Sequence, residues 1–210
     1  MSPLPFPARR RFLRAQRPAP AGRVAILNGA LPGDTELDRV HEELHDAFSA
    51  TGHIIESFRL RDIPLAYCLG CFECWTKTPG ICRTKDDGPA IAEAIIRSDV
   101  TVWLSAVTFG GYASELKKAL DRINCLVSPS FTRVRGEVHH RPRYDRFPFV
   151  LCFGMLPESD AEQERIFRTL VERNAINMHA PGHAAEILYR GHDPRDVWEG
   201  LERLAQRRVA

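Results

Sequence analysis

Short apolar segments alternate with amphipathic helical patterns from residue 23 onward, and this alternation constrains the fold more than any other feature of the chain. Five runs of apolar or alternating residues indicate strands, at 24–27, 53–60, 100–104, 149–153 and 184–189. Helical spacing follows each of them, with starts at Thr35, Asp86, Ser114, Ser159 or Asp160, and Asp193. Parallel strands joined by helices are covered on both faces, which matches continuous apolar strands. We therefore expect an α/β fold, a doubly wound five-stranded parallel sheet of order 2-1-3-4-5.

Several helix starts carry local signals. Thr35 and Asp38 have the spacing of a capping box at the start of a helix that extends to residue 50. Pro89 suits the first turn of the next helix, and Ser114 is a candidate cap for the one after it. In the helix that begins at residue 159 or 160, the spacing predicts burial of Ile166, Leu170 and Val171.

Charge is distributed unevenly along the chain. The formal net charge is +2 at pH 7, but residues 1–23 hold six arginines and no acidic residue. The remainder is net negative, which argues against nucleic acid as a partner. Residues 1–22 also hold five prolines, and such a segment predicts a disordered arm or a tether to an anionic surface. We therefore expect an arm over 1–22 and one domain over 23–210.

Localisation follows from what the sequence carries. No apolar stretch approaches the ~18–20 residues that a membrane-spanning helix needs, so we expect no membrane partner. The arginines at 9–11 resemble the start of a twin-arginine export signal, but no apolar segment follows them. Six cysteines in 210 residues do not form a small disulfide scaffold. We expect the protein in the reducing cytoplasm.

The loop after the first strand has the features of a phosphate site. It contains Asn28, Gly29, Ala30 and Thr35 and ends where a helix begins. Ligands of doubly wound sheets lie beyond the carboxyl ends of the strands, and backbone N–H groups at a helix start favour an anion. The loop has neither the dinucleotide fingerprint nor a phosphate-loop lysine, so it suits a mononucleotide better than NAD or ATP. An ordinary capped helix start is the alternative.

The loop after the third strand has the features of a site for a flat ring. Its glycines let the backbone approach a ligand closely, and its aromatic residues offer ring surfaces. The candidate ring-contacting residues are Ala106, Val107, Thr108, Phe109, Gly110 and Tyr112. A glycine turn with two core aromatic residues is the alternative.

Four cysteines, Cys68, Cys71, Cys74 and Cys82, fall within fifteen residues after the second strand. Their spacing is closer to that of iron–sulfur ligands than to the two separated pairs usual for zinc. The sequence leaves three readings open: metal-free thiols, a [4Fe–4S] cluster, and zinc or a redox-active thiol pair.

Three motifs, in this order, resemble the NAD(P)H-dependent FMN reductase-like branch of the flavodoxin superfamily. They are the first strand with its Asn-Gly turn (24–29), the cysteine-rich loop (68–87), and the glycine loop with its following helix (107–117). The cysteine spacing is also similar to that of iron–sulfur flavoproteins. Ala30 and Ala106 stand where the family has serine and proline.

The resemblance implies a flavodoxin-like fold with bound FMN, and electron transfer from NAD(P)H to a flavin, quinone or similar small acceptor. It also implies assembly as a homodimer or homotetramer. The insert at 124–148 is then an interface loop or a lid. The alternatives are an iron–sulfur flavoprotein that carries electrons, and a non-enzymatic flavodoxin-like binding or sensor protein, which Ala30 and Ala106 favour.

Overall fold

The computed structural model describes residues 22–191 and residue 193. The expected arm and the expected last helix lie outside this range, apart from Gly22 and Asp193. Among the helices of the described part, none is long and apolar enough to cross a membrane.

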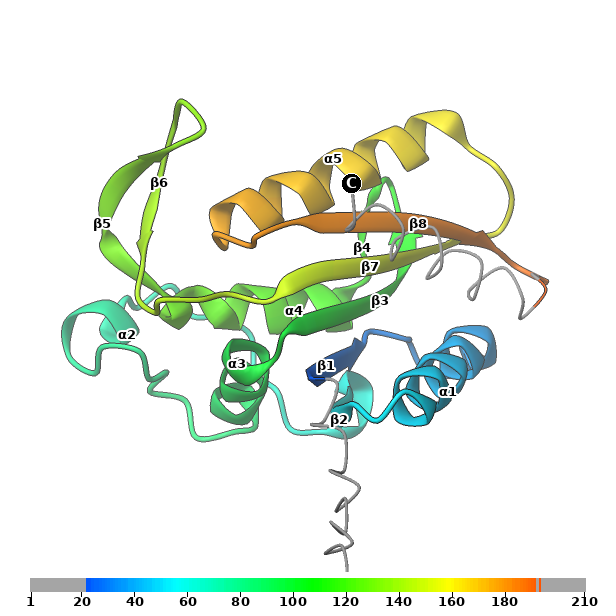
Figure 1. The fold of residues 1–210 in the computed structure, drawn as a ribbon, viewed down its shortest axis with the longest axis horizontal. Helices are drawn as coiled ribbons and strands as arrows, with labels where there is room; N and C mark the ends of the chain where they lie inside the picture. The colour runs from blue at the N-terminus through cyan, green and yellow to red at the C-terminus, as the bar shows by residue number, and fades with distance from the viewer. Residues whose placement is uncertain (1–21, 192, 194–210) are drawn as a thin grey trace, which may run out of the picture.

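A parallel sheet forms the centre of the molecule (Figure 1). Its strands are β1 (Arg23–Asn28), β2 (Ile54–Arg59), β3 (Val100–Thr108), β7 (Phe149–Leu156) and β8 (His183–Tyr189). Their order is β2-β1-β3-β7-β8, and every neighbouring pair is parallel. The predicted order 2-1-3-4-5 is confirmed. A short strand β4 (Gly111–Tyr112) pairs antiparallel with the end of β3.

Helices cover both faces of the sheet because neighbouring residues of each strand point to opposite sides. On one face Ile26 and Leu104 pack with α1 (Thr35–Ala50). On the other face Trp103 packs in one cluster with residues of three helices, which are α3 (Gly88–Arg97), α4 (Ser114–Arg122) and α5 (Ala161–Asn177). In Figure 1, α1 and α5 accordingly lie on opposite sides of the sheet.

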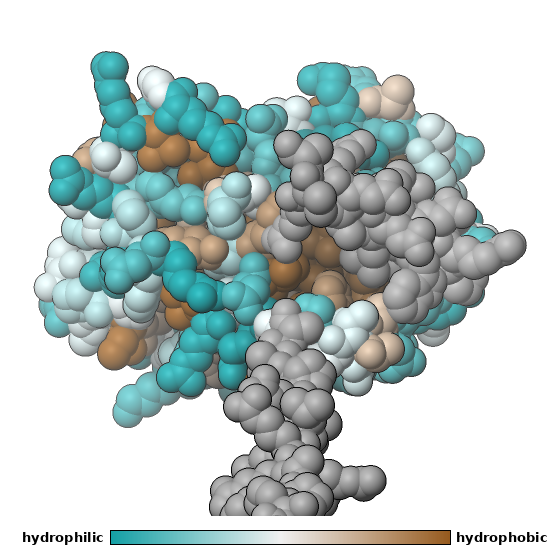
Figure 2. All heavy atoms as spheres, in the orientation of Figure 1, coloured by the Kyte–Doolittle hydropathy of each residue, from teal (hydrophilic) through white to brown (hydrophobic). Residues whose placement is uncertain are grey.

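The exterior is mostly hydrophilic and the interior apolar. Figure 2, in the orientation of Figure 1, shows mainly hydrophilic side chains on the visible face, with apolar side chains in its central part. The residues that are fully buried come from the strands and from the inward faces of the helices, and the largest are Trp103, Phe153 and Phe167.

Two predicted helix caps are wrong. The cap of α1 is Asp34, whose carboxylate accepts a hydrogen bond from the N–H of Leu37, whereas Asp38 turns away to basic partners. The residue before α4 is Ala113, which has no capping side chain, so Ser114 is already helical. Pro89 does lie in the first turn of α3, as expected.

The buried face of α5 was predicted only in part. The helix begins after Asp160, whose carboxylate accepts from two backbone N–H groups. Val171 is fully buried, Leu170 is half-buried, and Ile166 is 36% exposed. Ile166 instead covers Gly110, where a Cβ atom would come within 2.5 Å of it.

The insert at 124–148 forms a structured arm rather than an irregular loop. It contains η2 (Ile123–Leu126), β5 (Val127–Val134) and β6 (Glu137–Pro142), and the two strands pair antiparallel. The hairpin turns at Arg135 and Gly136, both with positive φ, and stands out beside the end of α5 (Figure 1). The remaining short helices are η1 (Leu60–Asp62) and α2 (Glu73–Thr76).

Gly154 in β7 tests how closely the sheet packs against α5. A Cβ atom there would lie 2.7 Å from Phe167 and 2.8 Å from Val107, so we expect Gly154→Ala to lower the free energy of unfolding by about 1–3 kcal/mol. Urea denaturation measures the change. Gly111→Ala is the control, because its nearest neighbour would be at 3.4 Å. Equal stability of the two variants would contradict the packing described for β7.

Candidate flavin site

The two loops singled out from the sequence lie side by side at the carboxyl edge of the sheet. Asn28 at the end of β1 is the register partner of Leu104 in β3. The N–H of Gly29 then donates to the carbonyl of Leu104 at 2.8 Å. A Cβ atom on Gly29 would lie 2.6 Å from Leu116 and 2.9 Å from that carbonyl. Only glycine fits this close approach of the first loop to β3 and α4.

The first loop is held by Asn28, which is 1% exposed. Its amide oxygen accepts from the N–H of Ala30 at 2.8 Å, and its amide nitrogen donates to Asp38 at 3.0 Å. Ala30 is buried, whereas Thr35 is exposed in the first turn of α1. Of the predicted phosphate-contacting residues, Thr35 is thus the one with a side chain open to a ligand.

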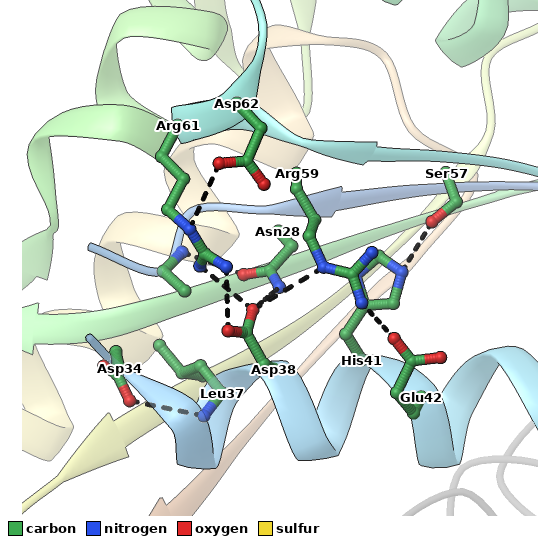
Figure 3. Close-up of polar contacts among 11 residues, drawn as sticks. Asn28, Asp34, Leu37, Asp38, His41, Glu42, Ser57, Arg59, Arg61 and Asp62 are labelled. Atoms are coloured by element: carbon green, nitrogen blue, oxygen red, sulfur yellow. Dashed lines mark hydrogen bonds and ion pairs between the residues drawn. The ribbon is translucent and has the colours of Figure 1, made fainter. Parts of the chain in front are cut away.

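A dense ionic network surrounds the start of α1 (Figure 3). Arg61 binds the carboxylate of Asp38 through two hydrogen bonds of 3.0 and 2.8 Å. Arg59 lies 3.8 Å from the same carboxylate and also pairs with Glu42. Burial raises the pKa of Asp38, but Arg61, Asn28 and Arg59 outweigh it and leave the pKa below its usual value. This loop is therefore already rich in fixed charge.

His41 lies one turn further along α1. It is 3% exposed, and its Nε2 atom lies 2.6 Å from the hydroxyl of Ser57 in β2 (Figure 3). Burial, with the nearby charge of Arg59, lowers the pKa of His41. Its place between helix and strand gives it a packing role.

Asp34 and Arg190 form a second ion pair at the same helix start. The Asp34 carboxylate is 7% exposed and takes two hydrogen bonds from Arg190, of 3.1 and 3.0 Å. Arg190 follows β8 directly, and its N–H donates to the carbonyl of Leu156 in β7. The sequence offered no signal for this contact, because 156 residues separate the two partners.

The second loop is a tight turn between β3 and β4. Phe109 and Gly110 have φ angles of 50° and 75°, a pair suited to a two-residue hairpin turn. Phe109 is 93% exposed, and Thr108 is exposed beside it. Ala106 is half-buried and Val107 is 8% exposed. The turn therefore presents Thr108 and the Phe109 ring to a ligand.

Tyr112 does not share this exposure. Its ring packs edge-on against Trp103 and Phe167, and its hydroxyl accepts a hydrogen bond from Asn174 at 3.1 Å. Burial raises its pKa. The expectation that Tyr112 offers a surface to a flat ring is corrected: it belongs to the core beneath the turn.

The four clustered cysteines line one small cavity of about 30 Å³, together with Arg122. That volume accommodates roughly one water molecule, whereas a [4Fe–4S] cluster has eight atoms. Across residues 22–191, no group of three or more His, Cys, Asp or Glu is arranged to hold a metal ion. Of the three readings left open by the sequence, the [4Fe–4S] cluster is therefore not supported.

The thiols around this cavity differ in their surroundings. Cys68 and Cys71 are exposed, whereas Cys74 and Cys82 are half-buried. Burial, and then the neighbouring thiols, raises the pKa of Cys74. Buried Cys125 lies next to them, and its burial raises the pKa to about 11, so it stays protonated at neutral pH.

A buried ion pair that the sequence did not reveal anchors the cysteine loop. Arg122 at the end of α4 donates to both oxygens of Asp86, at 2.7 Å each, and to the carbonyl of Ala66 at 2.8 Å. The two side chains are 1% and 8% exposed. Their hydrogen bonds lower the pKa of Asp86 to about 2, against the opposing effect of burial.

The two loops differ in how well they would accommodate the two ends of FMN, the ring system and the phosphate. The exposed Phe109 turn offers a surface and backbone for the ring system. At the start of α1, however, Asp34, Glu36 and Asp38 already place three carboxylates. Asp34 also occupies the N–H of Leu37 and both terminal nitrogens of Arg190. A flavin phosphate at the start of α1 would therefore need a counter-charge, and Arg190 is the arginine bound to the carboxylate that it would meet.

We expect Arg122→Met to lower the free energy of unfolding by about 3–5 kcal/mol, because Asp86 would stay buried without its partner. Arg97→Met is the control, since its pair with Glu93 is exposed and contributes about 0–1 kcal/mol.

The same pair predicts a pH dependence. The folded pKa of Asp86, about 2, lies below its ordinary value of 3.8. The stabilisation is therefore complete above the ordinary value and is lost as the pH falls toward 2. Denaturation at several pH values should show a shallower acid loss in Arg122→Met than in wild type. An identical acid profile in both proteins would contradict the pairing.

The fold is shared with several solved structures, two reductases and a flavodoxin among them, at low sequence identity. An NAD(P)H:quinone oxidoreductase from Methanothermobacter marburgensis aligns with a TM-score of 0.60 and 17% identity, covering 87% of this chain and 92% of that one. An azoreductase from Bacillus anthracis aligns with a TM-score of 0.56 and 14% identity, covering 88% and 97%. Oxidised flavodoxin 1 from Bacillus cereus aligns with a TM-score of 0.53 and 11% identity, covering 87% of this chain and 95% of that one.

Comparison with curated protein sequences gave no match, whereas comparison with protein families gave one. Residues 23–144, which include both loops and the cysteine segment, match the NADPH-dependent FMN reductase family. This match covers more than half of the chain and agrees with the flavodoxin-like sheet. The chain therefore belongs to the NADPH-dependent FMN reductase family of NAD(P)H-dependent flavin oxidoreductases.

Proposed function

We propose that the protein binds FMN at the carboxyl edge of β1 and β3 and passes electrons from NAD(P)H to a flavin, a quinone or a similar small acceptor. The observation that carries the proposal is the contact of the first loop with β3, in which Gly29 donates to Leu104. It brings the start of α1 next to the strand that leads into the exposed aromatic turn, in a chain of this family. The quinone oxidoreductase among the structural neighbours supports quinones as acceptors.

The two loops divide the binding task. Asn28, Gly29, Ala30 and Thr35 shape the helix start that would receive the phosphate. The turn formed by Ala106, Val107, Thr108, Phe109 and Gly110 would receive the ring. Bound FMN would supply the chemistry, accepting a hydride from NAD(P)H and releasing electrons to the acceptor. The chain's own part is to orient the ring and to leave one face of it open.

The proposal does not include a metal centre, because the cavity between the four cysteines does not fit a cluster. Exposed thiols at Cys68 and Cys71 suit a reducing compartment, and we extend the proposal to the cytoplasm.

The direct test is a titration of the purified full chain with FMN, followed by flavin fluorescence. We expect quenching on binding, and then oxidation of NADPH or NADH when a benzoquinone is added. Loss of all NAD(P)H oxidation on removal of FMN completes the test. A protein that binds no added FMN would contradict the proposal.

Phe109→Ala tests the ring half of the site. A stacked aromatic contact contributes about 0.5–1.5 kcal/mol, so we expect FMN affinity to fall about two- to twelve-fold. Phe72→Ala is the control, because Phe72 is also exposed but belongs to the cysteine loop. If both variants bind FMN as wild type does, the turn is not the ring site.

We also infer that the protein assembles as a homodimer or homotetramer through the β5–β6 hairpin. Phe131 and Val138 on this hairpin are 60% and 66% exposed, and a two-stranded hairpin gains stability from packing against other elements.

The oligomer is tested with the double variant Phe131→Ser and Val138→Ser. Sedimentation should show an oligomer for wild type and a smaller species for the variant. Ile81→Ser is the control, since Ile81 is 62% exposed but lies outside the hairpin. A monomeric wild type would contradict the assembly, and an unchanged oligomer in the double variant would exclude the hairpin.

A further inference from the structure

We propose that Arg190 is the residue that selects a phosphate-bearing flavin, and that Asp34 is a built-in competitor which holds Arg190 until the phosphate arrives. This inference rests on the proposed function, because it assigns the phosphate end of the same site. It concerns two residues that come from opposite ends of the described chain and meet at the start of α1.

Asp34 occupies the position that a bound anion would take. Its carboxylate caps the helix by accepting the N–H of Leu37 at 3.3 Å (Figure 3). N–H groups at a helix start are natural partners of a phosphate. The side chain is 7% exposed, so its negative charge is shielded little by water. A phosphate that entered the first turn would meet this carboxylate at close range and be repelled by it.

Arg190 is the group that makes entry possible. Its guanidinium meets Asp34 in a two-pronged contact, the geometry in which arginine also recognises phosphate. Unlike Asp34, the Arg190 side chain is 42% exposed, so its outer side is open to a second anion. The backbone at Arg190 stays fixed through its hydrogen bond to Leu156, and only the side chain needs to turn.

The other cations near α1 are less available. Arg61 is 18% exposed and is committed to Asp38 through two hydrogen bonds. Arg59 is shared between Asp38 and Glu42. Arg59 is as exposed as Arg190, and Arg190 also lies 4.0 Å from Glu36. Arg190, however, is hydrogen-bonded to the carboxylate that caps α1, so a phosphate that displaces Asp34 from the helix start meets Arg190 first. Riboflavin, which has the same ring but no phosphate, would gain nothing from Arg190 and would not oppose Asp34.

The experiment compares FMN with riboflavin. The full chain is titrated with each flavin at one fixed ionic strength, and quenching of flavin fluorescence gives both dissociation constants. Asp34→Asn keeps a good helix cap but removes the charge. It should tighten FMN binding about ten- to a hundred-fold, and Arg190→Gln should weaken it by a similar factor. Riboflavin affinity should stay within about two-fold in both variants. Riboflavin has no phosphate, so it neither gains the charged contact with Arg190 nor is repelled by Asp34.

Two further variants sharpen the result. Arg190→Lys keeps the charge but loses the two-pronged contact, so its FMN affinity should lie between wild type and Arg190→Gln. Arg23→Gln is the matched control, because the Arg23 side chain is 40% exposed and pairs with Glu56 at the opposite edge of the sheet. It should leave both affinities unchanged. Thermal unfolding of each variant confirms that it is folded.

The outcomes separate the two claims. If wild type and every variant bind neither flavin, the proposed function fails and the selection mechanism fails with it. If both flavins bind but the ratio of their affinities is the same in wild type, Asp34→Asn and Arg190→Gln, the proposed function stands and the roles of Asp34 and Arg190 are wrong. Opposite shifts of that ratio in the two variants are the result that the inference requires.

Discussion

The parallel pairing of β1 with β3 is the constraint on which the site depends. It brings Asn28 level with Leu104, and the next residue, Gly29, closes against the Leu104 carbonyl. A shift of one residue would reverse the faces of β1, placing Ile26 toward α3 and Leu27 toward α1. The same shift would break the hydrogen bond from Gly29 to Leu104. The buried core and the ligand edge are thus fixed by one register.

The charges at this edge explain how a family member can differ from a simple phosphate-binding loop. Ala30 provides no hydroxyl, and its N–H is taken by Asn28. Two carboxylates and three arginines form ion pairs there instead: Asp38 binds Arg59 and Arg61, and Asp34 binds Arg190. The start of α1 is therefore stable without a ligand. In the proposed mechanism a phosphate would exchange one of these contacts, that between Asp34 and Arg190, whose arginine side chain is 42% exposed.

The sequence predicted what depends on periodicity and missed what depends on distant pairs. The positions of the five main strands followed from apolar runs, because burial on both faces leaves a direct record in the sequence. Their order followed from the doubly wound topology that this spacing fits. Asp86 and Arg122 lie 36 residues apart, and Asp34 and Arg190 lie 156 apart, so no local pattern marks them. The hairpin was within reach, since Arg135 and Gly136 form a recognisable turn. Tyr112 was misjudged because exposure depends on tertiary packing.

A crystal structure of the full chain soaked with FMN measures the central claim most directly. The account predicts ring density against the turn at Thr108 and Phe109, and phosphate density at the start of α1 within hydrogen-bonding distance of Arg190. Flavin density at any other edge of the sheet would contradict it. So would a bound phosphate that makes no contact with Arg190 while Arg190 stays hydrogen-bonded to Asp34.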